Sequence, residues 1–174
     1  MKYLVKFIVV TFFLLICTHT FAEQKIVVLD LTFVLNNSKA GKDAQDFLKK
    51  SFQDNEKKFS DMEKNLKKEE ADLLSKKTVL SKEEYTKKTD TLRKKVIDYQ
   101  SQRRSALDKI TTQRAQSRDT LIKKIKPILN TYMNEKNISL VVDKKNLLAG
   151  KPEYDITKII LEKLNKELPS LNLK

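Results

Sequence analysis

The fold is decided by two stretches of equal length, residues 48–73 (LKKSFQDNEKKFSDMEKNLKKEEADL) and residues 85–110 (YTKKTDTLRKKVIDYQSQRRSALDKI). Both carry apolar residues in alternating steps of three and four, the heptad spacing of helices that pack as a coiled coil. We call these apolar positions the hairpin seam: Leu48, Phe52, Phe59, Met62, Leu66 and Leu73 in the first stretch, and Tyr85, Leu92, Val96, Tyr99, Ala106 and Ile110 in the second. The pattern predicts two long amphipathic helices.

The two halves of the seam mirror each other along the chain. The residue numbers of opposite members, such as Phe59 with Tyr99, always add up to 158. The polar residues that interrupt the seam follow the same rule, Asn55 with Arg103 and Glu69 with Thr89. Level layers in an antiparallel helical hairpin require such a constant sum. We therefore predict a hairpin with its tip near residues 77–80 and its second helix starting at the capping box of residues 81–84 (SKEE).

Strand signals lie outside the hairpin, near the two ends of the chain. Residues 25–30 (KIVVLD) and 138–143 (ISLVVD) are β-branched runs of the kind found in buried strands. If the two runs pair, the ends of the chain form one body and the hairpin is an arm inserted between its strands. Residues 155–164 (DITKIILEKL) have helical periodicity, with Asp155 as the expected cap of a closing helix.

The predicted class is thus α+β, with a small β-rich body and a long helical arm. The body comprises residues 23–41 and 134–174, and the arm residues 42–133. A body of this size is marginal on its own, so we expect it to bury strand edges and apolar faces against copies of itself. Its expected core and oligomer contacts are Ile26, Val28, Leu140, Val142, Ile156 and Ile160.

The N-terminal residues 1–22 have the pattern of a secretory signal peptide. Two lysines precede a short apolar run, and small residues end at Ala22. An alternative is a lipid anchor on Cys17, but the bulky Ile16 stands where such a site needs a small residue. Cleavage after Ala22 would remove Cys17 and His19, leaving a mature chain without cysteine or histidine. This export signal and the lack of cysteine suggest a bacterial envelope compartment.

Positive charge is concentrated on the arm. The whole chain of 174 residues carries a formal charge of +13, and residues 49–126 alone hold 23 basic and 13 acidic residues, a net +10. Such charge can simply keep an extended helix soluble, but solubility does not require one sign to gather on one element. The candidate contacts for an acidic or anionic partner are Lys67, Lys68, Lys76, Lys77, Lys87, Lys88, Arg93, Lys94, Lys95, Arg103 and Arg104.

The composition argues against catalysis. Clustered histidine, cysteine or carboxylate ligands for a metal are not recognisable, and the acidic group at residues 69–72 is better explained as helix-surface partners for lysine. Phosphate cradles need glycine-rich turns, whereas the chain has only two isolated glycines. We therefore expect a protein that is not an enzyme and needs neither cofactor nor metal.

The chain resembles the Skp/OmpH family of periplasmic chaperones. The resemblance rests on the strand residues 25–30, the basic hairpin, and the Leu-Val-Val-Asp strand followed by Asp-Ile-Thr at residues 155–157. The resemblance implies a homotrimer whose bodies join in a barrel-like core and whose three arms surround a cavity for unfolded outer-membrane proteins. It also implies lipopolysaccharide binding through basic arm residues, for which Arg103 and Arg104 are candidates by charge.

The resulting hypothesis is an ATP-independent periplasmic holdase that keeps unfolded outer-membrane proteins from aggregating before membrane insertion. Lysine and arginine heads would bind client carboxylates, and their alkyl stems would contact apolar client segments. Two other classes stay open: a structural coiled-coil protein of the envelope, and a binder of anionic lipid or lipopolysaccharide surfaces. Nucleic acid binding is expected to be incidental to the positive charge.

Overall fold

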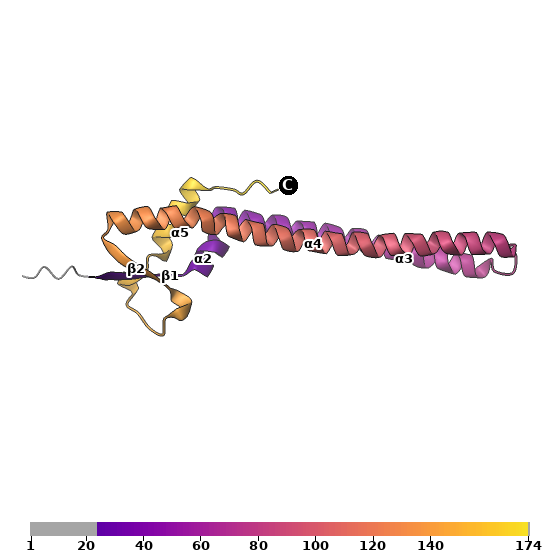
Figure 1. Ribbon diagram of the computed structural model, residues 1–174, viewed down its shortest axis with the longest axis horizontal. Helices are drawn as coiled ribbons and strands as arrows, with labels where there is room; N and C mark the ends of the chain where they lie inside the picture. Colours follow the sequence, from indigo (N-terminus) through magenta and orange to yellow (C-terminus); the bar gives the residue numbers. More distant parts are fainter. Residues whose placement is uncertain (1–23, 174) are drawn as a thin grey trace, which may run out of the picture.

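The structure is a computed structural model that describes residues 24–173. Two long helices dominate it, α3 (Lys39–Ser75) and α4 (Lys82–Glu135), which run antiparallel and side by side (Figure 1). The turn at residues 76–81 joins them at the end farthest from the body. The predicted signal peptide of residues 1–22, with Cys17, lies outside the described residues.

The start of α4 confirms the predicted capping box. The Ser81 hydroxyl accepts a hydrogen bond from the backbone N–H of Glu84 at 3.3 Å, and the Glu84 carboxylate accepts one from the backbone N–H of Ser81 at 3.2 Å. Each residue thus satisfies an amide that the helix geometry leaves without a partner. Hydrogen bonds from the Ser81 side chain and backbone also lower the pKa of Glu84.

Strands β1 (Lys25–Leu29) and β2 (Ile138–Asp143) pair in parallel, with Ile26 opposite Leu140 and Val28 opposite Val142. Parallel strands need a long crossover connection, and here that connection contains the entire hairpin. The prediction of an α+β fold with an arm inserted between two strands is therefore confirmed.

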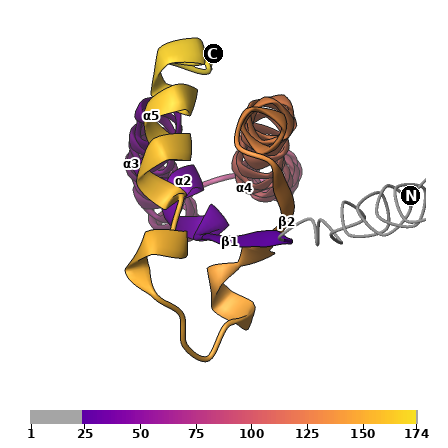
Figure 2. The ribbon, with the colours of Figure 1, turned by 90° about the vertical axis from the view of Figure 1, so that its left-hand side faces the viewer.

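The body is less rich in β-structure than expected. Within residues 24–173, this two-stranded sheet is extended only by a single bridge between Val28 and Asp155. Most of the body is helical: α2 (Leu31–Asn37), α5 (Thr157–Glu167) and the roots of α3 and α4. Two short 3₁₀ turns, Lys144–Asn146 and Pro152–Tyr154, shape the loop between β2 and α5. Seen from the body end, α3 and α5 lie on one side and α4 on the other, above the strands (Figure 2).

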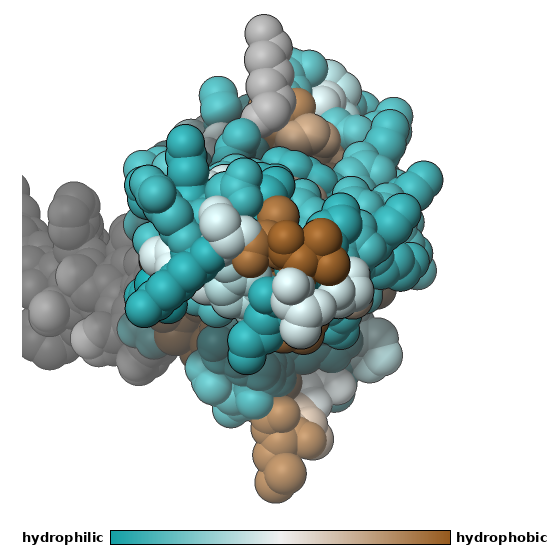
Figure 3. Space-filling view, turned by 90° about the vertical axis from the view of Figure 1, so that its right-hand side faces the viewer, coloured by the Kyte–Doolittle hydropathy of each residue, from teal (hydrophilic) through white to brown (hydrophobic). Residues whose placement is uncertain are grey.

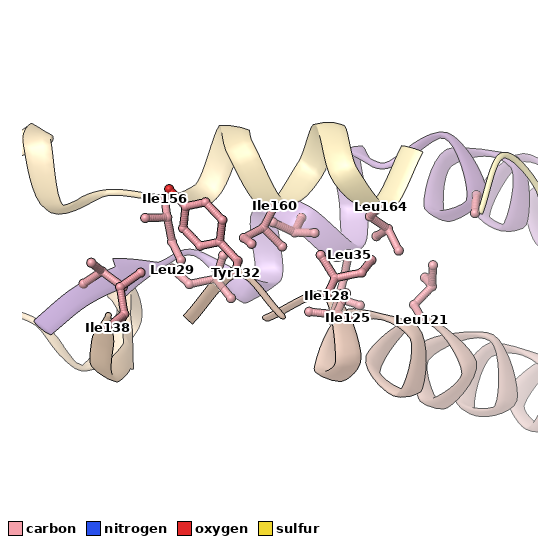
Figure 4. Packing of buried hydrophobic residues seen from close by; sticks show 13 residues of the cluster. Leu29, Leu35, Leu121, Ile125, Ile128, Tyr132, Ile138, Ile156, Ile160 and Leu164 are labelled. Carbon is pink, nitrogen blue, oxygen red and sulfur yellow. The ribbon is translucent and has the colours of Figure 1, made fainter. Parts of the chain in front are cut away.

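The hydrophobic core lies where α5 packs against α2 and the root of α4 (Figure 4). Ile160 and Leu164 of α5 are fully buried, and Ile125 and Ile128 of α4 face them. Full burial of such a side chain contributes roughly 1.5–3 kcal/mol. The core of the body is thus formed mainly between helices α5, α2 and the root of α4.

Helix α5 begins one residue later than predicted. Its N-cap is Ile156, not Asp155, because the Ile156 N–H donates to the Val28 carbonyl at 2.9 Å and holds this segment against the sheet. The Asp155 carboxylate still accepts from the Thr157 N–H at 2.9 Å. Asp155 therefore stabilises the first turn from outside the helix.

The six body residues expected in the core or at an oligomer contact fall into two groups. Val28, Ile156 and Ile160 are buried and Val142 is half-buried. Ile26 and Leu140 are 47% and 50% exposed, so their prediction as core residues of the single chain is wrong. The two are opposite each other in the sheet, and no described element covers that position. Their role as oligomer contacts stays a prediction.

Candidate binding surfaces of the arm

The hairpin seam holds α3 and α4 together with a thin apolar contact. Phe59 is buried and its ring packs edge-on against Tyr99, with centroids 6.0 Å apart and planes at 72°. Leu48 and Ile110 are also buried. The other seam positions except Phe52 are half-buried: Met62, Leu66, Leu73, Tyr85, Leu92, Val96, Tyr99 and Ala106. Much apolar surface therefore stays partly open to solvent along the arm.

Phe52 departs from the seam, with 47% of its surface exposed. Its level partner is Ala106, whose methyl group is too small to cover an aromatic ring. The next layer is polar: the Asn55 amide donates to the Ser51 carbonyl, and the Arg103 side chain is exposed. A hollow of about 210 Å³ results, which we call the mid-arm hollow. Its apolar lining is Phe52, Phe59, Tyr99, Ala106 and Leu107, and its charged lining is Glu56, Glu63 and Arg103. The heptad pattern gave no sign of this hollow.

All eleven basic candidates on the arm are exposed. Three of them form ion pairs: Lys67 with Glu63 at 2.7 Å, Arg93 with Asp90 at 3.0 Å and Lys95 with Glu69 at 2.7 Å. The hydrogen bond and charge of Lys67 lower the pKa of Glu63, while Glu63 raises the pKa of Lys67. The remaining eight form no ion pair within residues 24–173. Exposed ion pairs are worth little, so nearly all of this positive charge is available to a partner.

The structure brings four of these lysines together near the tip. Lys76, Lys87, Lys88 and Lys95 line one open hollow between the helices. Three carboxylates line the same hollow, Glu69, Asp72 and Glu84. This place therefore has mixed charge and is not a purely cationic site.

The tip itself combines apolar and basic side chains. Val79 is 81% exposed and Leu74 is 58% exposed. Lys76, Lys77 and Lys82 are exposed around the same turn. Seen end-on, the arm shows a small apolar centre surrounded by hydrophilic side chains (Figure 3). The mirror symmetry of the seam predicts a tip at this place but gives no sign of its apolar surface.

The body also exposes apolar side chains, which we call the body face: Ile26, Phe33, Leu140, Leu147, Leu148 and Tyr154. Phe33, Leu147 and Leu148 line a hollow of about 570 Å³ beside the end of the sheet. Contiguous exposed apolar patches mark interaction surfaces, and Phe33, Leu147 and Leu148 come together at this hollow. This face is a candidate for contact with copies of the same chain.

Within residues 24–173, no group of three or more histidine, cysteine, aspartate or glutamate side chains is placed to hold a metal ion. The helices of this part of the chain include none that is both long enough and apolar enough to cross a membrane. The arrangement is one of exposed charge and exposed apolar surface, which suits binding of a chain or surface by many weak contacts.

Comparison with known proteins shows what the chain is similar to. Residues 25–164 match the family model OmpH, which is described as "Outer membrane protein (OmpH-like)". A Skp-like protein of Pseudomonas aeruginosa is 25% identical over 170 residues, which cover 95% of this chain and 99% of the relative. The crystal structure of an OmpH-like protein of Caulobacter crescentus, described as a candidate outer membrane chaperone, has a TM-score of 0.81 at 17% identity and covers 90% of this chain and 93% of that one. Because the family model spans both strands, the whole arm and most of α5, the chain belongs to the OmpH-like family of outer membrane proteins.

Proposed function

We propose that this protein is an ATP-independent periplasmic holdase for unfolded outer-membrane proteins. The observation that carries the proposal is the long arm with a net charge of +10, on which eight of eleven candidate cations have no ion partner among the described residues. The Skp-like relative and the fold shared with the OmpH-like protein of Caulobacter crescentus support it. The proposal includes no catalytic step and no cofactor.

Binding would consist of many weak contacts. Lysine and arginine heads attract client carboxylates, and their alkyl stems cover apolar surface. Exposed apolar groups on the arm, such as Phe52 and Leu107, contact apolar client side chains. Individually weak contacts give useful affinity when many act at once on one chain. Release then needs no hydrolysis, because a client gains more free energy by folding into a membrane.

The proposed active form is a homotrimer, as the family resemblance implies. The body face supplies apolar surface for self-association, and Ile26 with Leu140 would be covered there. Association of the bodies would set three arms side by side. Their combined positive charge creates an attractive potential for acidic unfolded chains in the space between them.

Binding to an anionic lipid or lipopolysaccharide surface is a second candidate function. The tip favours it, because the exposed Val79 and Leu74 could enter the lipid interface while Lys76, Lys77 and Lys82 contact anionic headgroups. A purely structural spacer of the envelope has no need for either feature.

One comparison of affinities separates these functions. The mature protein is titrated, without nucleotide, against a urea-diluted unfolded outer-membrane barrel protein, anionic liposomes and duplex DNA. A holdase binds the unfolded client much more tightly than either of the other two. Comparable affinity for liposomes and client would favour the lipid-surface function. No binding to the client would contradict the proposal and leave the structural spacer.

A further inference from the structure

Another hollow lies at the root of the arm, where α2, α3 and α4 meet. Its volume is about 630 Å³, and we call it the root groove. Its apolar lining consists of Leu35, Ala44, Leu48, Phe52 and Leu121. Four of these side chains are buried in the protein, whereas Phe52 stands exposed at the edge toward the tip. The groove therefore has a fixed apolar floor with one accessible aromatic side chain.

A glycine lets α2 and α3 meet at one corner of the groove. A Cβ at Gly41 would collide with the Leu35 carbonyl oxygen, so only a residue without a side chain allows α2 to lie this close to α3. The Gln45 amide donates to the Asn36 carbonyl at 3.2 Å and fixes the same corner. Across the groove, the Ser117 hydroxyl donates to the Gln113 carbonyl at 2.7 Å and does not reach the opposite wall. These contacts within and between the helices thus fix the walls of the groove at the arm root.

The rim of the root groove carries positive charge that nothing in its lining balances. Lys49, Arg114 and Arg118 line the groove, and none of its lining residues is acidic. Arg114 and Arg118 are one helical turn apart on α4, and neither forms an ion pair or hydrogen bond within residues 24–173. The hollow near the tip differs in this respect, because Glu69, Asp72 and Glu84 face its lysines. The root groove therefore has an apolar floor and a purely cationic rim.

We propose that the root groove binds a segment of an unfolded client in which a large apolar side chain stands next to an acidic one. The apolar side chain would lie on the floor beside Phe52, and the carboxylate would accept hydrogen bonds from the Arg114 and Arg118 guanidinium groups. The inference deepens the proposed holdase function and rests on it.

The geometry of the arm favours a polypeptide as the occupant. Phe52 lines both the root groove and the mid-arm hollow, so the two hollows adjoin along the arm. An extended chain places side chains at regular intervals, and one segment can therefore fill both hollows. The mid-arm hollow has the aromatic Phe59 and Tyr99 in its lining, but Glu56 and Glu63 stand there beside the exposed Arg103, so it suits a second apolar side chain of the client and not a second acidic one.

The test uses fluorescein-labelled peptides with blocked ends, in which Phe-Asp pairs are separated by Gly-Ser spacers, and matched peptides with Asn in place of Asp. The double variant Arg114→Gln with Arg118→Gln should bind the Asp peptide about tenfold more weakly, a loss of about 1.4 kcal/mol. The matched control, Lys109→Gln with Lys124→Gln, removes the same charge from exposed positions of α4 outside the groove and should change affinity less than twofold. Wild-type protein should bind the Asn peptide weakly, and neither double variant should alter that.

A second pair of variants tests the apolar part of the groove. Phe52→Ala should weaken binding of the Asp peptide severalfold, whereas Ile97→Ala, at an exposed large apolar residue of α4 outside the groove, should not. Equal losses in the arginine variant and its lysine control would overturn the inference, because overall charge would then explain binding. Laurate and unlabelled Asp peptide are also compared as competitors of the labelled peptide. If laurate displaces it at a lower concentration than the unlabelled peptide does, the inference is overturned in favour of a lipid occupant.

Failure of this inference can be told from failure of the holdase function. If wild-type protein does not keep an unfolded outer-membrane protein soluble, the function itself is wrong. If wild-type protein does so and the arginine variant holds the client as long as its lysine control does, the function stands and the root groove is not its binding site.

Discussion

Asp155 connects three parts of the body. Its carboxylate accepts hydrogen bonds from the Lys144 ammonium at 2.8 Å and from the Thr157 N–H at 2.9 Å, and its backbone bridges to Val28 of β1. Partial burial is the largest single influence and would raise the pKa of Asp155, but the hydrogen bonds from Lys144 and Thr157 together outweigh it and lower the pKa from 3.8 to about 2. The charged form is therefore favoured in the folded body.

This lowered pKa predicts a specific pH dependence. A carboxylate whose pKa falls on folding stabilises the folded chain above its unfolded pKa, near 4, and loses that contribution as the pH falls toward 2. Asp155→Asn should cost about 1 kcal/mol at pH 7, after allowance for solvent screening, and almost nothing at pH 2. Urea unfolding followed by circular dichroism at both pH values measures this difference. Glu153→Gln, a nearby exposed carboxylate, should keep the wild-type pH dependence, and an identical cost of Asp155→Asn at both pH values would contradict the assignment.

Gly41 is required by a close approach of two helices and not by an unusual backbone angle. Alanine is normally the better residue inside a helix, by about 1 kcal/mol. Here the added methyl group would collide with the Leu35 carbonyl, so Gly41→Ala should destabilise the protein by about 1–3 kcal/mol. Gly150→Ala should have little effect, because its methyl group would meet only the flexible end of Leu147. Urea midpoints of the two variants give the comparison, and a Gly41→Ala protein more stable than wild type would show the contact to be wrong.

At the scale of elements, the hairpin has a defined register. The edge-on packing of Phe59 against Tyr99 agrees with the constant sum of residue numbers. In a Cys17→Ser background, Met62→Cys with Val96→Cys should therefore form a disulfide on mild oxidation. Met62→Cys with Thr89→Cys should not, because the second cysteine is displaced by one heptad, about 10 Å along the helix axis. Mass spectrometry of the oxidised proteins distinguishes the two, and cross-linking of only the displaced pair would contradict the register.

The hairpin could be predicted because its information is local and repeated. Each heptad adds evidence for a helix, and the mirror symmetry around residue 79 gives the direction and register of the second helix. The parallel strands could be recognised for a similar reason, since both are short β-branched runs with a clear end at an aspartate, Asp30 and Asp143.

Other features could not be predicted because they depend on residues far apart in the sequence. The start of α5 is shifted by the hydrogen bond from Ile156 to Val28, across more than a hundred residues. The exposure of Phe52 depends on the small size of Ala106 on the opposite helix. The root groove needs α2 to pack beside α3 at Gly41, and the charge of Arg114 and Arg118 matters only because no acidic residue of the other two helices lines the same hollow.

At the scale of the whole molecule, the long arm carries the net positive charge and the body carries almost none. The arm segment of residues 49–126 has a net charge of +10, while the remaining described residues, which include the body, are nearly neutral. Attraction between the arms and an acidic client is screened by salt, since the Debye length falls from about 10 Å at 0.1 M to about 3 Å at 1 M. Client affinity should therefore fall and client release should accelerate as salt rises. Stopped-flow fluorescence of a labelled client measures both, and an affinity that is equal at low and high salt would refute the electrostatic part of the proposal.

The central claim is that the arms hold unfolded outer-membrane proteins without an energy source. The most direct measurement is the soluble fraction of an outer-membrane barrel protein after dilution from urea, with the mature protein present at one trimer per client and no nucleotide. We expect the client to stay soluble. Replacing Lys76, Lys77, Lys87 and Lys88 by glutamine should reduce this protection while the arm stays helical by circular dichroism. A client that aggregates as fast with the wild-type protein as without it would contradict the account.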